Sequence, residues 1–391
     1  MKIAIFSDSF FPLVDGVTIS IKNNMEILSK KNKIFFFVPS GTDKLNIKNS
    51  EYIHLKSFPI KSYKEYRLRI PTFKKVYQHL KKIKPNIVHI HSPFGIGWEG
   101  LVVARWLKIP VVATAHTIFP EVASELDLKG FQKSKIFQKL TWKYLFSFFN
   151  KCTAIITPSE AMKKELIIRG LKKEIYPVSN GINLKKFSHS KREKRVPIFI
   201  STSRLVESKH IDVLLKAFNI FKKEGIDGKF LIVGKGPEEK NLKEYIIKNK
   251  LSKYVQFKGF VKPEKMIKEY QKADVFLTAS TIETEGITTL EAMSTGLPVI
   301  GVDARATPTL VGKDAGFIAP VGDEKKIAEY MEKLSKSYAL KQKLGKNASE
   351  IAKKYELKKM NKKLFETYKK VIKNYKKKKI NFLNNIFLEL L

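Results

Sequence analysis

Two glutamates, Glu283 and Glu291, stand eight residues apart on either side of a glycine, Gly286, in a segment whose residue types could bind a polar, charged ligand. An apolar run that favours a strand, Val275–Thr278, precedes the segment, and we expect a helix to begin near Ile287. Backbone N–H groups at a helix start bind anions, and a glycine there removes side-chain bulk, so the segment suits a diphosphate. Carboxylates accept hydrogen bonds from sugar hydroxyls but repel bare phosphate. The pattern therefore predicts a ligand that carries both hydroxyls and phosphates.

This segment resembles the signature of the family-4 retaining glycosyltransferases of the GT-B fold. In that signature the second glutamate is followed by Ala-Met and then by Gly-Leu-Pro, which stand here at 292–293 and 296–298. The resemblance implies that Glu283 contacts the donor hexose and that Glu291 contacts the ribose. It also implies that N–H groups at the helix start lie near the sugar and the diphosphate, namely those of Gly286, Ile287 and Thr288.

Two glycine turns extend the resemblance. The segment Phe11–Val17 looks like the first loop of the family, in which Gly16 lets the backbone approach the donor phosphate. The segment Leu231–Pro237 matches another turn of the family through Gly234 and Gly236. A lone Gly-x-Gly is weak evidence by itself, so the second turn adds little.

A pair of cations, Arg204 and Lys209, resembles the Arg and Lys with which the family neutralises the leaving diphosphate. Two fixed cations are what a departing nucleotide diphosphate needs where no metal site is present. His210 follows the lysine where the family has glycine, and we expect it to alter the turn without removing the charges.

Three histidines, His89, His91 and His116, stand at the expected ends of strands. Their spacing from cysteines and carboxylates does not match a metal-ligand pattern, so no metal site is predicted. His116 matches the active-site histidine of the family, with Ala115 in place of the usual aromatic residue. The resemblance implies that His116 holds a donor-sugar hydroxyl or helps the acceptor to approach, while we expect His89 and His91 to be structural.

Apolar runs of strand length alternate with segments of helix length, which is typical of an α/β protein with parallel sheets. The alternation stops near 177–183 at a turn, which is followed by the polar stretch 188–195. The alternation of strands and helices then starts again. Two Rossmann-like domains facing each other across a cleft are therefore expected, at 1–183 and 184–365, followed by a basic and apolar tail at 366–391. The GT-B resemblance implies that the C-terminal helix crosses back to the first domain. The expected strands are 3–7, 34–38, 87–90, 111–115 and 154–157 in the first half, and 198–202, 229–233, 255–259, 275–278 and 299–302 in the second.

The composition favours a folded protein with acidic partners. The chain has 391 residues, is 43% hydrophobic, and carries a formal net charge of +38, which suits nucleic acid, anionic lipid or a phosphorylated substrate. Frequent Lys and Asn in both halves also fit a compositional bias with no functional cause. The single cysteine, Cys152, lies in an apolar run and is expected in the core. We expect neither an export signal nor a membrane span.

Finer features point to a lipid acceptor. Several segments of the sequence resemble those of bacterial 1,2-diacylglycerol 3-glycosyltransferases. These segments are 283–288, Asp303–Arg305 with Pro308, and the residues around His89 and His116. The resemblance implies transfer of glucose or galactose from a nucleotide-sugar substrate, UDP-glucose or UDP-galactose, to diacylglycerol with retention of configuration. It implies no tightly bound cofactor and a peripheral place on the cytoplasmic side of the membrane. The segments 61–69 and 129–150 mix lysines with aromatic residues and predict a face for an anionic bilayer; the tail 380–391 suits either an interfacial anchor or a helix end packed on the first domain.

Three alternatives compete with this interpretation. A glycosyltransferase of the same family could act on another lipid-linked or cell-envelope acceptor. A basic nucleic-acid-binding protein would explain the charge, but it predicts a recognisable reading motif, which the sequence lacks, and leaves the glutamate pair unexplained. A dinucleotide-dependent oxidoreductase fails because no Gly-x-Gly-x-x-Gly follows the first strand.

Overall fold

The computed structural model describes residues 1–13, 15–60, 63–118, 134–184 and 196–389, with the side chains of 60, 63–66, 68–69 and 377–389 left aside. The polar stretch 188–195 that marks the expected domain boundary lies outside these residues. The chain forms two compact units, one of residues Met1–Asn180 with Leu357–Leu391 and one of Gly181–Glu356. The C-terminal helix therefore belongs to the first unit, as the GT-B resemblance implies.

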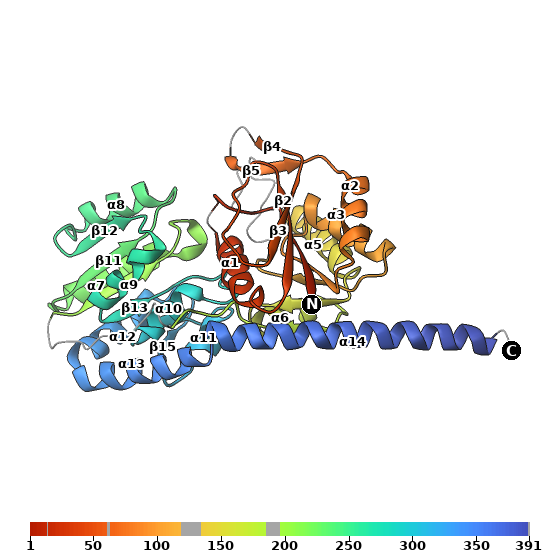
Figure 1. The fold of residues 1–391 in the computed structure, drawn as a ribbon. Helices are drawn as coiled ribbons and strands as arrows, with labels where there is room; N and C mark the ends of the chain where they lie inside the picture. Colours follow the sequence, from red (N-terminus) through yellow and green to blue (C-terminus); the bar gives the residue numbers. More distant parts are fainter. Residues whose placement is uncertain (14, 61–62, 119–133, 185–195, 390–391) are drawn as a thin grey trace. The chain divides into compact units, whose positions relative to one another are not determined.

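The first unit is built on a parallel sheet in the order β3-β2-β1-β6-β7-β8-β9. Alternate residues of β1 enter two separate cores. Ala4 and Phe6 join the core under α2, α3, α5 and α6, while Ile3 and Ile5 join the core under α1 and α14 (Figure 1). The strands are β1 (Lys2–Phe6), β2 (Lys33–Pro39), β3 (Ser50–Leu55), β6 (Ile87–Ile90), β7 (Val111–Thr114), β8 (Ala154–Thr157) and β9 (Ile175–Pro177).

The helices of this unit cover both faces of the sheet, as continuous apolar strands require. α14 contacts α1 and buries one stripe, of which Leu364, Tyr368 and Val371 are members. An antiparallel hairpin of β4 (Ser57–Ile60) and β5 (Tyr63–Arg69) follows β3. The helices are α1 (Gly16–Leu28), α2 (Phe73–Ile83), α3 (Gly95–Trp106), α5 (Lys135–Phe149), α6 (Glu160–Ile168) and α14 (Leu357–Glu389).

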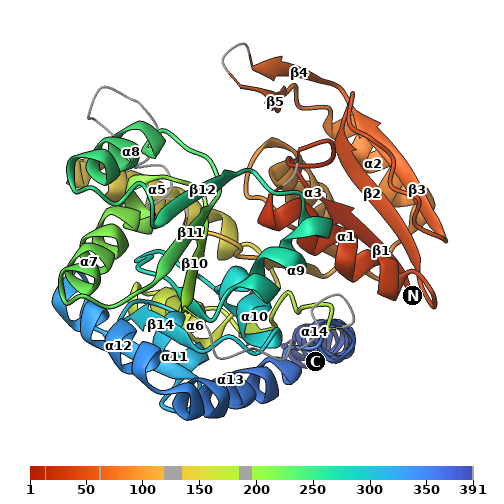
Figure 2. The same cartoon turned by 90° about the vertical axis from the view of Figure 1, so that its left-hand side faces the viewer.

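The second unit repeats the plan with a parallel sheet in the order β12-β11-β10-β13-β14-β15. Figure 2 shows α7 and α8 on one side of this sheet and α9 and α10 on the other. The strands are β10 (Ile198–Thr202), β11 (Lys229–Val233), β12 (Val255–Gly259), β13 (Val275–Leu277), β14 (Val299–Val302) and β15 (Gly316–Ala319). The helices are a 3-10 turn η3 (Glu207–Lys209), α7 (Ile211–Lys223), α8 (Glu239–Lys248), α9 (Pro263–Lys272), α10 (Ile287–Ser294), α11 (Thr307–Val311), α12 (Glu324–Lys336) and α13 (Tyr338–Lys353).

The two Rossmann-like folds and the ten expected strands are confirmed, to within a residue or two at their ends. The sequence prediction missed β3, β9, β15 and the β4–β5 hairpin; polar residues interrupt β3 and β5, whereas β15 is a short apolar run that was overlooked. In both sheets the strand order reverses beside the first strand of the unit, between β1 and β6 and between β10 and β13. Ligands of such sheets bind at the carboxyl ends of the strands at this switch point.

No helix within the described residues is both long and apolar enough to cross a bilayer.

Candidate functional site

The glutamate segment lies at the switch point of the second sheet. It leaves the carboxyl end of β13 and enters α10, which begins at Ile287 as the sequence predicts. Gly286 is the N-cap residue and has φ +80, a left-handed conformation that favours glycine. Since the cap residue has no side chain, the first N–H groups of α10 are left for a ligand.

Two of the predicted residues contact each other. Lys209, at the end of the turn after β10, places Nζ 2.5 Å from the Glu283 carboxylate after β13. The Lys209 ammonium also donates to Ser280 Oγ at 3.3 Å. The neighbouring strands β10 and β13 bring these loops together. Both side chains are mostly buried, so the pair forms one positioned unit, able to act on the sugar and phosphate ends of one ligand.

Glu291 lies inside α10 and accepts a hydrogen bond at 3.0 Å from the Tyr270 hydroxyl of α9. Tyr270 is fully buried and also contacts Thr202 Oγ1 at 3.0 Å. Burial raises the pKa of the Glu291 carboxyl to about 7, against the Tyr270 hydrogen bond, which lowers it. Glu291 therefore holds a desolvated carboxyl that a polyhydroxyl ligand would satisfy.

The Arg204 loop rests directly on the Gly234–Gly236 turn. A Cβ atom at Gly234 would lie 1.8 Å from the Ser203 carbonyl oxygen, and one at Gly236 would lie 2.2 Å from that of Leu205. Glycine is therefore required for this close packing. The Gly-x-Gly, weak as a motif, supports the backbone on either side of Arg204.

His210 follows Lys209 in a backbone conformation that favours glycine. Its backbone has φ 48 and ψ 44, in the left-handed region, where it joins the 3-10 turn to α7. A residue other than glycine adopts this conformation at a cost of roughly 1–2 kcal/mol. That histidine alters the turn of the family stays a prediction.

In the first unit, Gly16 begins α1, and Asp15 caps the helix by accepting from Thr18 N–H at 2.7 Å. A Cβ atom built on Gly16 would meet no atom within 4 Å, and its φ is not left-handed. The fold therefore does not require glycine here, and the space beside the Gly16 backbone is open to a ligand.

The three histidines form one cluster at the carboxyl ends of β6 and β7, at the switch point of the first sheet. His89 uses both ring nitrogens, with Tyr368 Oη and Thr114 Oγ1 each at 2.6 Å. His91 Nδ1 lies 2.9 Å from His116 Nε2. Desolvation by burial lowers the pKa of His89 to about 3 and that of His116 to about 4, and that of His91 well below its usual value. All three rings are neutral at physiological pH.

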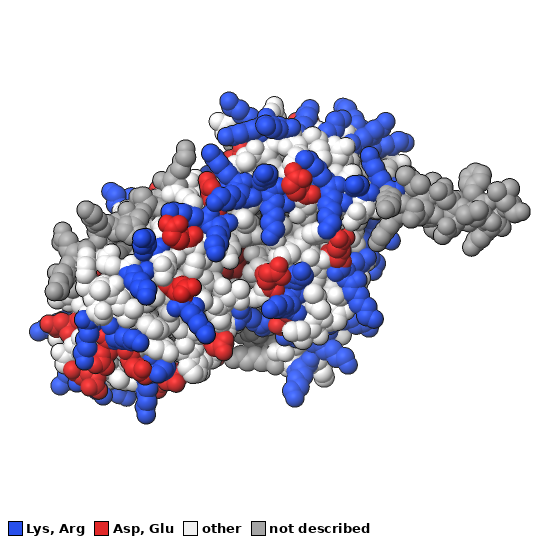
Figure 3. Space-filling view, turned by 90° about the horizontal axis from the view of Figure 1, so that it is seen from below, with Lys and Arg blue, Asp and Glu red and all other residues white. Residues whose placement is uncertain are grey.

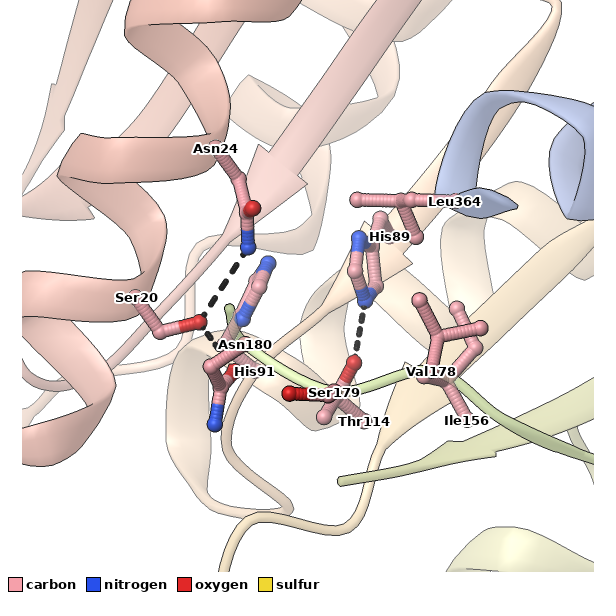
Figure 4. Close-up of a pocket in the computed structure, with 10 residues that line it drawn as sticks. All are labelled: Ser20, Asn24, His89, His91, Thr114, Ile156, Val178, Ser179, Asn180 and Leu364. Carbon is pink, nitrogen blue, oxygen red and sulfur yellow. Dashed lines mark hydrogen bonds between the residues drawn. The ribbon is translucent and has the colours of Figure 1, made fainter. Parts of the chain in front are cut away.

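A small pocket adjoins this cluster, with room for about one water molecule. Figure 4 shows His91 beside Ser20, Asn24 and Asn180, with His89 nearer to Leu364 and Thr114. Ser20 links the two asparagines, accepting from Asn24 Nδ2 at 3.3 Å and donating to Asn180 Oδ1 at 2.5 Å. In the described part of the chain, no group of His, Cys, Asp and Glu could hold a metal ion.

Comparisons with known proteins now identify the family. The family model for glycosyl transferases group 1 matches residues 183–351, and the model for glycosyltransferase family 4 matches residues 14–186. An alpha-monoglucosyldiacylglycerol synthase of Acholeplasma laidlawii is 32% identical over 77% of this chain and 80% of its own length. The chain belongs to the family-4 glycosyltransferases of the GT-B fold. A second alpha-monoglucosyldiacylglycerol synthase, from Streptococcus pneumoniae, is 30% identical over 77% of this glycosyltransferase and 70% of its own length.

Solved structures agree with this fold. The Anabaena protein HepE in complex with UDP superposes on the glycosyltransferase with a TM-score of 0.76, at 17% identity over 95% of this chain and all of that one. A sucrose-phosphate synthase from Thermosynechococcus elongatus gives the same TM-score over 96% of this chain.

The described part of the expected membrane face comprises the strand β5 and the helix α5, and the exposed side chains described lie on α5. Ile136 and Leu140, one helical turn apart, are 67% and 56% exposed, and Lys135, Lys139 and Lys143 are exposed beside them. Two apolar side chains flanked by three lysines are an arrangement suited to a bilayer interface. Residues 61–62 and 129–133 of the expected face, Phe131 among them, lie outside the described residues.

Basic side chains also gather on α14 of this glycosyltransferase. Opposite its buried stripe, its outer face carries exposed lysines, and Figure 3 shows few acidic side chains on the surface around it. These lysines are Lys358, Lys359, Lys362, Lys363, Lys369, Lys370, Lys373 and Lys376.

Two contributors to the site were missed by sequence reasoning. Tyr270 was overlooked, and its signal was an aromatic residue one helical turn after Met266 in the segment 263–272. The contact between His91 and His116 was missed because each histidine was considered alone. Within the second unit the structure brings Glu283 to Lys209, and it places Gly286 and Glu291 at the cap and in the body of one helix.

Proposed function

We propose that this glycosyltransferase moves glucose or galactose from a UDP-sugar to the 3-hydroxyl of 1,2-diacylglycerol, with retention of configuration, and so makes an α-glycosyl diacylglycerol. The observation that carries the proposal is the match, over most of the chain, to two relatives named alpha-monoglucosyldiacylglycerol synthase. The donor class is supported by fold neighbours solved with UDP, one of them also with glucose.

In this proposal the second unit binds the donor. Glu291 accepts hydrogen bonds from the ribose hydroxyls, and the N–H groups of Gly286, Ile287 and Thr288 face the sugar and the diphosphate. Glu283 holds the hexose hydroxyls. Gly16, in the first unit, allows the backbone to approach the donor phosphate.

The chemical step is a front-face attack of the acceptor hydroxyl on the anomeric carbon. A C–O bond forms there as the bond to the diphosphate oxygen breaks, and that leaving oxygen takes the acceptor proton. Negative charge grows on the diphosphate, and Arg204 and Lys209 stabilise it. Glu283 is ion-paired with Lys209 and acts as a positioning group, so no covalent glycosyl-enzyme is required, unlike in retaining glycosidases.

His116 takes part as a neutral imidazole. Because burial lowers its pKa to about 4, it carries one ring hydrogen at physiological pH and both donates and accepts hydrogen bonds. That chemistry suits holding a donor-sugar hydroxyl or guiding the acceptor hydroxyl, and it does not suit a cationic role.

The acceptor is reached from the cytoplasmic side of an anionic membrane, on which the enzyme sits as a peripheral protein. The exposed pair Ile136 and Leu140 enters the interface, and the lysines beside them contact anionic headgroups. Each lysine near such a surface contributes about 1 kcal/mol.

The direct test is transfer of label from UDP-glucose and from UDP-galactose into dioleoylglycerol, in vesicles with and without anionic lipid. We expect one labelled glycolipid, formed faster with anionic lipid, whose α linkage is checked by NMR. A β linkage would contradict retention, and turnover of no nucleotide-sugar would contradict the whole proposal.

A matched pair of variants tests the membrane face. Ile136→Ser removes an exposed isoleucine of α5, whereas Ile247→Ser removes one of nearly equal exposure, 70%, from α8 in the second unit. We expect only Ile136→Ser to weaken vesicle binding, by about tenfold. Equal effects of the two variants would refute this face.

A second candidate acceptor follows from other relatives. Among them are a sulfoquinovosyl transferase from Arabidopsis thaliana and a capsular polysaccharide glycosyltransferase from Staphylococcus aureus, at 24% and 28% identity. Assays with a polyprenyl-linked sugar and with phosphatidylinositol as acceptors distinguish these possibilities from diacylglycerol. Label in one of these, and none in diacylglycerol, would move the acceptor and keep the enzyme class.

A further inference from the structure

The helix α5 carries an apolar stripe whose exposure changes along its length. Ile136, Leu140 and Tyr144 stand four residues apart, so they lie along one side of the helix. They are 67%, 56% and 37% exposed, and Phe148, four residues further on, is fully buried. The α5 stripe, defined as Ile136, Leu140 and Tyr144, therefore runs from the surface of the first unit toward its core.

The inner end of the α5 stripe is fixed at the switch point of the first sheet. The Tyr144 hydroxyl accepts a hydrogen bond from Trp98 Nε1 at 2.9 Å and donates one to the carbonyl oxygen of Pro93 at 2.5 Å. Pro93 lies in the loop that leaves the carboxyl end of β6, two residues after His91. The stripe therefore ends at the loop that begins with His91.

The outer end of the α5 stripe extends past the sheet. α5 leads through a short connection into the amino end of β8, so its earlier turns lie toward the carboxyl ends of the strands. Its 15 residues span about 22 Å, whereas the four residues of β8 span about 13 Å. Leu145 is the first buried residue of this helix. The turns that carry Ile136 and Leu140 therefore project beyond the strands.

The side chains around the α5 stripe suit an uncharged apolar chain. α5 contains no Asp or Glu. Lys135, Lys139 and Lys143 each stand one residue before a member of the stripe, so they form a separate row beside it. An apolar row next to a cationic row matches a lipid chain that lies on the apolar side while neighbouring anionic headgroups meet the lysines.

We propose that the α5 stripe binds one acyl chain of the lipid acceptor and so directs the glycerol hydroxyl to the loop after β6. The inference rests on the proposed function and adds to it a site for the acceptor. From Ile136 to Tyr144 the stripe is about 12 Å long. An extended chain advances about 1.2 Å per bond, so about ten bonds of an acyl chain cover the stripe.

The dependence of KM on chain length tests this site without a membrane. Transfer is measured to dibutyrylglycerol, dihexanoylglycerol and dioctanoylglycerol, each dissolved below its solubility limit with neither vesicles nor detergent. A methylene removed fully from water gains about fourfold in affinity, and one that lies against an open stripe gains about twofold. Four methylenes added to the chain on the stripe should therefore lower KM about sixteenfold from dibutyrylglycerol to dioctanoylglycerol.

Leu140→Ser interrupts the middle of the α5 stripe at an exposed position, so the variant should fold. We expect the sixteenfold fall in KM to shrink to about fourfold, and the loss to appear in KM for the longer chains but not in KM for the UDP-sugar. Ile168→Ser is the control, since Ile168 is an 81% exposed residue at the end of α6 in the same unit. It should keep the wild-type dependence.

A binding measurement that needs no turnover locates the chain. A dihexanoylglycerol analogue with a photoreactive diazirine at the end of one chain is irradiated with the enzyme in the absence of UDP-sugar. Trypsin cleaves after Lys135, Lys139 and Lys143, so the peptides 136–139, 140–143 and 144–151 separate the members of the stripe. We expect label on these peptides in the wild type and in Ile168→Ser, less label in Leu140→Ser, and loss of label when dioctanoylglycerol competes.

The inference is overturned if wild type and Leu140→Ser depend equally on chain length, or if the label lies outside 136–151. The two readouts also separate this inference from the proposed function. Label on α5 that dioctanoylglycerol displaces, with no glycolipid from either UDP-sugar, would refute the proposed function and keep the site. Glycolipid formed by an enzyme that is labelled elsewhere would keep the function and overturn the site.

Discussion

At the scale of single residues, the charge of Glu291 depends on pH within the physiological range. Burial raises the pKa of its carboxyl to about 7, and only the ionised form accepts from two ribose hydroxyls at once. Below pH 7 the ionised fraction falls about tenfold per pH unit, so we expect the affinity for UDP to fall in parallel and to be level above pH 8. Calorimetric titration with UDP between pH 5.5 and 8.5 measures this.

The controls for this prediction are Glu291→Gln and Tyr270→Phe. UDP titrates as well, because a terminal phosphate has a pKa near 6. Glu291→Gln retains only that contribution, and subtracting its profile isolates the carboxyl. Tyr270→Phe removes a hydrogen bond that lowers the Glu291 pKa, so the transition should move to higher pH. Superimposable profiles for wild type and Glu291→Gln would show that Glu291 does not contact the ligand.

At Gly16 a substitution should affect donor binding without affecting the stability of the fold. A Cβ atom there meets nothing within 4 Å and the backbone is not left-handed, so Gly16→Ala should leave the free energy of unfolding unchanged to about 0.5 kcal/mol. If the donor phosphate approaches this backbone, KM for the UDP-sugar should rise at least about tenfold. Urea unfolding measures the stability of the Gly16→Ala variant, and donor-dependent kinetics measure its KM for the UDP-sugar. An unchanged KM would remove Gly16 from the site.

At the scale of elements, the turn after β11 supports the loop after β10. Gly236→Ala would force a Cβ to within 2.2 Å of the Leu205 carbonyl oxygen, so the backbone beside Arg204 must move. We expect a loss of about 2–3 kcal/mol in the free energy of unfolding and a clear fall in turnover, because Arg204 follows its backbone. Urea unfolding and steady-state kinetics measure the two effects.

Gly225→Ala is the control, since Gly225 lies in a surface turn at φ +73 with no atom near a Cβ. It should cost about 1 kcal/mol of stability and leave turnover unchanged. If Gly236→Ala behaves like Gly225→Ala in both measurements, the turn does not position Arg204.

The elements also explain how far sequence reasoning reaches here. The strand β13, the start of α10 at Ile287 and the role of Gly286 follow from local patterns, namely an apolar run, a glycine and a helix period. The contacts of Glu291 with Tyr270 and of Glu283 with Lys209 depend instead on which elements are neighbours in space. That order, β10 beside β13 and α9 beside α10, is set by packing and is not written in any one segment.

Local patterns are equally insufficient for the histidines of the first unit, because their contacts depend on which strands are neighbours. His89, His91 and His116 were each recognised at a strand end, yet only the adjacency of β6 and β7 stacks them into one cluster. Tyr368 reaches this cluster from α14, 279 residues along the chain, so no local pattern could foretell it. Long-range contacts made by single polar atoms are the part of a site that local patterns do not contain.

At the scale of the whole molecule, the net charge of +38 makes association with anionic surfaces sensitive to salt. The basic run Lys376–Lys379 continues α14 beyond its buried stripe, in which the last fully buried residue described is Val371. A chain that ends after Lys376 should therefore keep its free energy of unfolding to about 1 kcal/mol. It loses three lysines and the apolar residues of 380–391, which is what an interfacial anchor would use.

The truncated enzyme distinguishes the two roles considered for the tail. Three lysines at about 1 kcal/mol each correspond to roughly a hundredfold weaker binding to anionic vesicles at low salt. The difference should shrink as salt is raised, because the screening length shortens. Transfer to detergent-solubilised diacylglycerol should be unaffected, since the truncation removes no residue proposed to bind donor or acceptor. A tail packed on the first unit predicts the opposite pattern, with lower stability and reduced transfer in detergent but unchanged vesicle binding.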